Sequence, residues 1–163
     1  MSTYQLPPQT KIGHVHLKVS DLQRSLEFYQ DLLGFEVISR MGDQAAFISA
    51  GGYHHHIGLN TWQSKNGSPP PPKSTGLFHL AILYPTRKDL ATILQRLFDH
   101  GQALTGAADH GVSEALYLND PDENGVELYW DRPQDTWPKT EDGGIDIYTK
   151  RLDLNNLLSE LET

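Results

Sequence analysis

The chain has 163 residues and a mass of 18.3 kDa, which suits one compact domain with a hydrophobic core. Its 13 basic and 21 acidic residues give a formal net charge of −8, which argues against nucleic acid and anionic membranes as partners. No apolar run reaches the roughly 20 residues that span a bilayer, and the first residues lack the pattern of a signal peptide. Cysteine is absent, which excludes disulfides and thiolate metal sites. We therefore expect a cytoplasmic protein.

The first part of the chain predicts one strand, one helix and three further short strands. Residues 13–19 alternate and are rich in β-branched side chains, which is typical of a strand. Ser20, with Gln23 three residues later, predicts a capping box, and apolar residues then recur at helical spacing up to Gly34. The three short strands are predicted at 35–40, 44–49 and 54–60.

The second part repeats this order after a proline-rich linker at 63–74. It predicts a strand at 77–84 and a helix that Thr86 caps and Gly101 ends. Three short strands follow, near 102–105, 114–119 and 125–130.

Such an internal repeat predicts an α+β fold built from two βαβββ modules. We place module 1 at about 12–62 and module 2 at about 75–131, within one domain at 1–138. The polar tail at 139–163 is expected to end in a short amphipathic helix at 152–161.

The repeat places three potential metal ligands in equivalent positions. His14 and His79 open the first strand of their modules, at the same distance before the expected helix. At the other end of each module, Gly58 is equivalent to Glu127. Two imidazoles and one carboxylate form a facial triad that suits Fe(II), and Mn(II) or another divalent metal is compatible with it. His16 lies on the same face of its strand as His14 and competes with it for the ligand role.

The stretch 13–37, GHVHLKVSDLQRSLEFYQDLLGFEV, resembles the opening of the vicinal-oxygen-chelate superfamily, which includes glyoxalases, fosfomycin and bleomycin resistance proteins and extradiol dioxygenases. The resemblance covers about 12–138. It implies paired βαβββ modules whose mixed sheets form an open cup around one metal. Because the ligands of that family come from the first and last strands of each module, it implies that His14, His79 and Glu127 bind the metal.

The stretch 107–127 resembles the signature of the extradiol dioxygenases, in which a histidine and a tyrosine precede an Asp-Pro turn and the ligand glutamate. The first two are His110 and Tyr117 here. The resemblance implies that their side chains hold the oxygens of the substrate.

Three consecutive histidines form the second discriminating feature. The dioxygenases carry a histidine pair in this part of module 1, and one member acts as the acid–base catalyst. Alternation along a strand would place His56 and His54 on the face of Gly58 and His55 on the other face. We therefore expect His56 to be the acid–base catalyst.

Taken together, the resemblance is closest to the catechol 2,3-dioxygenases. It implies a metal-dependent, extradiol-type dioxygenase of aromatic compound catabolism, which cleaves a small catechol with dioxygen and forms a homodimer. The alternatives are a glyoxalase-type lyase or isomerase, a metal-dependent resistance transferase, and a metal-free small-molecule binding protein. Gly58 counts against a glyoxalase, which needs a carboxylate base at that position. The ligand set His14, His79 and Glu127 counts against a metal-free protein.

Overall fold

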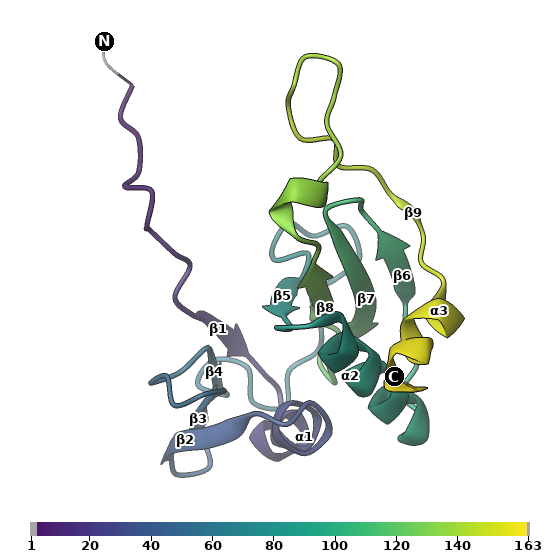
Figure 1. Cartoon of the computed structure of the whole chain (residues 1–163). Coiled ribbons are helices and arrows are strands. Elements are labelled where there is room, and N and C mark those ends of the chain that lie inside the picture. The colour runs from purple at the N-terminus through teal and green to yellow at the C-terminus, as the bar shows by residue number, and fades with distance from the viewer. Residues whose placement is uncertain (1–2, 163) are drawn as a thin grey trace.

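The computed structural model of the chain describes residues 3–162, which form two βαβββ modules and a C-terminal extension (Figure 1). Module 1 contains β1 (Val15–Lys18), α1 (Leu22–Leu26), β2 (Glu36–Met41), β3 (Ala45–Ser49) and β4 (Ile57–Asn60). Module 2 contains β5 (Leu80–Leu83), α2 (Arg87–Asp99), β6 (Gly106–Asp109), β7 (Ser113–Asn119) and β8 (Gly125–Asp131). The expected α+β fold of two modules is confirmed.

The C-terminal extension packs against module 2. It contains the short strand β9 (Lys150–Arg151) and the helix α3 (Leu154–Leu158), which lies beside α2. Leu152 and Leu157 are buried in the common hydrophobic core, so this extension is part of the folded body. Within residues 3–162, no helix has the length and apolar character that crossing a membrane requires.

Each module forms its own open, mixed sheet. The strand orders are β1-β4-β3-β2 and β5-β8-β7-β6-β9, with the first and last strands of each module paired in parallel. His16 lies opposite Gly58 in the first parallel pair, and Ala81 lies opposite Glu127 in the second. The two modules therefore have the same register, in which His14 and His79 each lie two residues before the paired position.

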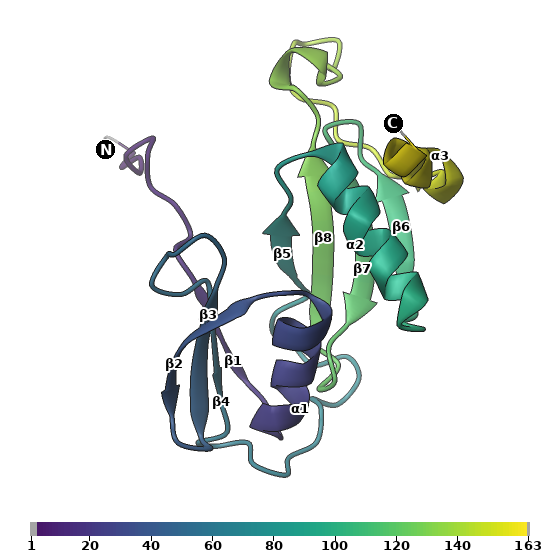
Figure 2. The ribbon, with the colours of Figure 1, turned by 60° about the horizontal axis from the view of Figure 1, so that its bottom comes forward.

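One face of each sheet is covered by the helix of its module, as Figure 2 shows for α2 across β7 and β8. Leu17 and Leu59 of module 1 and Leu116 and Leu128 of module 2 point into the shared core on this side. Because side chains alternate along a strand, the residues next to these leucines point to the opposite face of the sheet. The candidate site residues occupy that opposite face.

The two modules are joined by hydrogen bonds between the α1 region and the turn that connects β7 to β8. The buried hydroxyl of Tyr29 donates to Asp120 Oδ2 at 2.9 Å. Ser20 donates to Asp122 through its hydroxyl, at 2.5 Å, and through its amide, at 3.1 Å. The expected capping box at Ser20 is therefore wrong: Ser20 binds the other module, and Asp21 caps α1 by accepting from the amide of Arg24.

Some other boundaries also differ from the sequence-based prediction. α1 continues beyond Leu26 as a π-helical segment to Leu32 and ends before Gly34, whose φ of 89° is the left-handed conformation of a C-terminal glycine. The predicted cap at Thr86 is confirmed, and the structure shows that it forms a capping box with Asp89. The second strand of module 2, β6, begins at Gly106 and not at 102, because the chain first leaves α2 through an irregular segment.

Candidate functional site

His79 and Glu127 lie side by side on module 2. His79 immediately precedes β5, Glu127 lies on β8, and His79 Nε2 is 2.8 Å from Glu127 Oε2. Two ligands that bind one metal ion at 2.0–2.2 Å and at right angles would be separated by about 3 Å, so this spacing fits a shared ion. His79 Nδ1 is buried without a hydrogen-bond partner in the described part of the chain, whereas Nε2 makes the close contact with Glu127.

Tyr117 and His110 extend this pair into a line of polar side chains. Tyr117 lies directly opposite Glu127 in the β7–β8 pair, and its hydroxyl is 3.3 Å from Glu127 Oε1. The same hydroxyl lies 2.7 Å from His110 Nε2. Partial burial and the carboxylate of Glu127 raise the pKa of Tyr117 to about 12, so its phenol stays protonated near neutral pH. The structure thus brings together four of the predicted site residues.

The remaining predicted site residues lie on module 1. His14 precedes β1, and its ring centroid is 4.3 Å from that of His55 and 6.5 Å from that of His54. The ring of His55 also lies 5.2 Å from that of Phe47. The expectation that His55 faces away from His14 is therefore wrong. The reason is that β4 begins only at Ile57, so strand alternation does not govern His54 and His55.

His56 extends the hydrogen-bond ladder of β4 by one residue. Its amide donates to the carbonyl of Ile48, and its carbonyl accepts from the amide of Val15. Its Nδ1 atom is 3.0 Å from the hydroxyl of Ser49, which lies on the same face of β3 as Phe47. His56 therefore lies on the face that alternation predicts for it.

The close contact between His16 and Gly58 was not predicted from the sequence. A Cβ atom built at residue 58 would lie 2.8 Å from Cγ of His16, so the glycine makes room for this imidazole. Burial and the neighbouring His14 lower the pKa of His16. The missed signal was the pairing of the two residues in register, which requires the relative alignment of β1 and β4.

The described residues of a single chain do not assemble a complete metal site. No three His, Asp or Glu side chains among residues 3–162 converge to hold an ion. His14 precedes β1 of module 1, whereas His79 precedes β5 and Glu127 lies on β8, both in module 2. The two modules form separate sheets, as Figure 1 shows. One chain therefore brings two of the predicted ligands, His79 and Glu127, together on module 2 and places a group of histidines on module 1.

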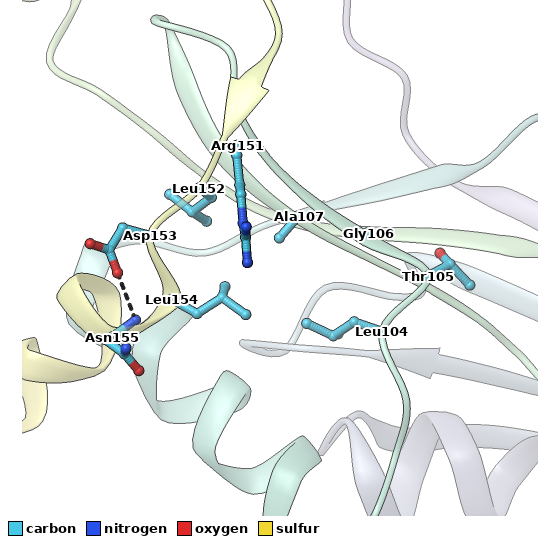
Figure 3. Close-up of a pocket in the computed structure, with 9 residues that line it drawn as sticks. All are labelled: Leu104, Thr105, Gly106, Ala107, Arg151, Leu152, Asp153, Leu154 and Asn155. Carbon is cyan, nitrogen blue, oxygen red and sulfur yellow. Dashed lines mark hydrogen bonds between the residues drawn. The ribbon is translucent and has the colours of Figure 1, made fainter.

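A cavity of about 690 Å³ lies elsewhere on module 2, between β6 and residues 151–155. Figure 3 shows the side chain of Arg151 extending along it, with Leu104 and Leu154 on its wall. None of the predicted site residues lines this cavity.

Comparisons with known proteins place this geometry in a family context. The chain is 42% identical over 152 residues to a catechol-2,3-dioxygenase from Bacillus subtilis, an alignment that covers 93% of the chain and 52% of that protein. It is 32% identical over 123 residues to biphenyl-2,3-diol 1,2-dioxygenase 3 from Rhodococcus globerulus, which covers 74% of the chain and 63% of that protein. The chain thus spans only about half to two thirds of the length of these relatives.

The fold is also found among solved structures. A glyoxalase/dioxygenase from Nostoc punctiforme matches 82% of the chain and 100% of its own length, with a TM-score of 0.65 and 20% identity, which supports the fold alone. A family model described as Glyoxalase/Bleomycin resistance protein/Dioxygenase superfamily matches residues 11–128, the region that contains both modules. The chain therefore belongs to the glyoxalase/bleomycin resistance protein/dioxygenase superfamily.

Proposed function

We propose that the chain is a metal-dependent, extradiol-type dioxygenase that cleaves a small catechol and works as a homodimer. The observation that carries this proposal is the line formed by His79, Glu127, Tyr117 and His110 on one face of module 2. His79 and Glu127 have the donor atoms and the spacing of metal ligands. Tyr117 and His110 add hydrogen-bonding groups next to Glu127. The relatives named catechol-2,3-dioxygenase and biphenyl-2,3-diol 1,2-dioxygenase support the same reaction class.

His14, His79 and Glu127 are the proposed metal ligands. Two imidazole nitrogens and one carboxylate suit Fe(II), and also Mn(II) or another divalent metal. When bound, the ion would supply Lewis-acid attraction for two adjacent diol oxygens and a redox centre for dioxygen.

A homodimer would supply the third ligand. The described part of one chain brings only His79 and Glu127 together, so we propose that His14 comes from a second copy. Two features support this arrangement. Among residues 3–162, the strands β1 and β5 each pair on one side only, so a second copy could lie along their other edges. The face around His14 also carries exposed rings, including those of Tyr53 and Trp62, which a second copy would cover.

The chain's own polar residues would then act on the diol. Tyr117 would donate a hydrogen bond to a substrate oxygen, because its raised pKa keeps the phenol protonated. His110 would stabilise the same oxygen or exchange a proton with it. His56 contacts Ser49 on the same module as His14. His56 of one copy is therefore the proposed general acid–base in the site that it shares with module 2 of the other copy.

Mixed dimers test the metal site and the dimer together. His14→Ala and Glu127→Ala chains are each expected to lose bound iron. A co-expressed dimer of the two should regain about half of the parental iron, because one of its two sites receives His14 from one chain and the His79–Glu127 pair from the other. The matched control combines His79→Ala with Glu127→Ala. In that dimer each site contains a His79–Glu127 pair with one altered residue, so neither site is restored.

The reaction is tested separately from the ligand set. Protein loaded anaerobically with Fe(II) should consume oxygen with catechol and form a yellow, ring-opened product. Restored iron without oxygen uptake would reject the dioxygenase and keep the site. Iron that is not restored in an assembled mixed dimer would reject the shared site. Isomerisation of a thiol adduct of an α-ketoaldehyde by the parent protein would favour a glyoxalase instead.

A further inference from the structure

The C-terminal extension reaches the candidate site at His110. β9 pairs with β6 at Asp109 and Ala108, and the amide of Tyr148 donates to the carbonyl of His110 at 3.3 Å. This segment therefore runs along the edge of the module 2 sheet up to His110. It lies outside residues 11–128, which the family model matches, so the superfamily assignment does not explain it.

The side chain of His110 is held by this segment. Its Nδ1 atom lies 2.8 Å from the carbonyl oxygen of Tyr148 and 3.3 Å from the hydroxyl of Thr149. A carbonyl oxygen can only accept a hydrogen bond, so Nδ1 must carry the proton. A neutral imidazole then has its lone pair on Nε2, which is the atom that faces the hydroxyl of Tyr117 at 2.7 Å.

We propose that the main-chain carbonyl of Tyr148 is a positioning group that fixes His110 in the Nδ1–H tautomer. The other tautomer would place two lone pairs against each other at Tyr148. It would also direct an N–H at the hydroxyl of Tyr117, which can still donate to Glu127 Oε1, at 3.3 Å. The repulsion at Tyr148 disfavours that tautomer, so the tail selects the Nδ1–H form, in which Nε2 can accept from Tyr117.

The selected tautomer defines what His110 can do in the site. Its Nε2 atom accepts a proton, whether from Tyr117 or from a hydroxyl-bearing ligand such as a diol. A role of this tautomer in catalysis rests on the proposed function. The tautomer itself rests only on the contacts of His110. The extension thereby becomes a positioning element of the site, although none of its residues is predicted to touch a substrate.

Nuclear magnetic resonance can observe the tautomer directly. Full-length protein with ¹⁵N-labelled histidine would be recorded without added metal at about pH 8.5, above the pKa of about 6.5 of a free imidazole. The His110 signals would be assigned by their loss in His110→Gln. We expect the long-range ¹H–¹⁵N pattern of a single Nδ1–H tautomer. An Nε2–H pattern, or signals averaged between both forms, would overturn the proposal, whether or not the protein cleaves catechol.

A variant of the tail tests the cause. Deletion of the exposed residue Ile147, between the Lys139–Ile145 bridge and β9, would take the Tyr148 carbonyl out of register. The His110 signals are then expected to shift to the averaged pattern. Tyr148→Ala removes only the side chain and should leave the tautomer unchanged. If the deletion variant keeps a pure Nδ1–H form, the carbonyl is not the cause. If that variant does not fold, the parent spectrum still tests the proposal, since an Nε2–H or averaged pattern overturns it.

Discussion

The imidazole of His16 lies over Gly58, so closely that a Cβ atom at residue 58 would come within 2.8 Å of its Cγ. The two residues face each other across the parallel β1–β4 pair. The glycine thus serves the packing of a neighbouring ring. The ring occupies the place where the equivalent residue of module 2, Glu127, carries a carboxylate.

Gly58→Ala is expected to destabilise the fold by about 1–3 kcal/mol, because the added methyl group must displace the ring of His16. Urea unfolding measures the change. The matched control is Gly106→Ala, whose Cβ would lie 3.7 Å from Tyr117 and should alter stability by less than about 0.5 kcal/mol. In a His16→Ala background the cost of Gly58→Ala should largely disappear, and an undiminished cost would contradict the explanation.

Tyr29→Phe is expected to weaken the contact between the two modules. The substitution removes a buried hydrogen bond to the carboxylate of Asp120, which is worth about 1.5–3 kcal/mol. Chemical denaturation should show this loss with an unchanged denaturant slope. Tyr4→Phe, at a residue that is 84% exposed, is the control and should have no effect. A loss below about 0.5 kcal/mol for Tyr29→Phe would mean that water replaces the bond.

The raised pKa of Tyr117 predicts that the free energy of unfolding depends on pH in the alkaline range. Its pKa is raised to about 12 by burial and by Glu127, whereas the unfolded chain has a tyrosine pKa of about 10. Between these values the unfolded chain loses the proton and the folded chain keeps it, so this contribution to stability is complete below pH 10 and is lost as the pH rises towards 12. Unfolding of metal-free protein at pH 9 and pH 11 should therefore show a smaller decrease for Tyr117→Phe than for the parent. Equal decreases would contradict the shift.

The hydrogen bonds of Arg87 are expected to attach α3 to module 2. Its guanidinium donates to the buried carboxylate of Glu114 at 2.8 Å, to Glu160 at 2.7 Å and to the side chain of Asn156 at 2.8 Å. Arg87→Ala leaves Glu114 with Arg132, so a loss of about 1.5–3 kcal/mol is expected. Hydrogen exchange should accelerate in the peptide that contains α3. Lys88→Ala, at the adjacent exposed position, should change neither quantity.

The repeat in the sequence predicted the modules, because periodicity and capping are local properties. Thr86 illustrates this, since its capping box needs only Asp89. Ser20 had the same local pattern but binds Asp122, a residue of the other module. Local rules could not predict that bond, because it exists only after the modules pack together.

The candidate site was likewise predictable only where local patterns or the repeat determine it. His79 and Glu127 were predicted as ligands from the repeat, and the parallel pairing of β5 with β8 brings them to 2.8 Å. The tail's contact with His110 could not be predicted, because it involves a main-chain carbonyl that no side-chain pattern reports. The position of His14 relative to this pair depends on how the two sheets are arranged, which neither module encodes by itself.

The parallel pairing of β5 with β8 also has a consequence for folding. His79 precedes the first strand of module 2 and Glu127 lies on its last strand, so the two become neighbours only when the whole module has closed. This contact joins residues that are far apart in the sequence of the module, and such contacts form late because loop closure must precede them. A metal ion held by this pair would add its binding free energy to the complete module and to no fragment of it. A nascent chain that ends before β8 would therefore gain nothing from the metal.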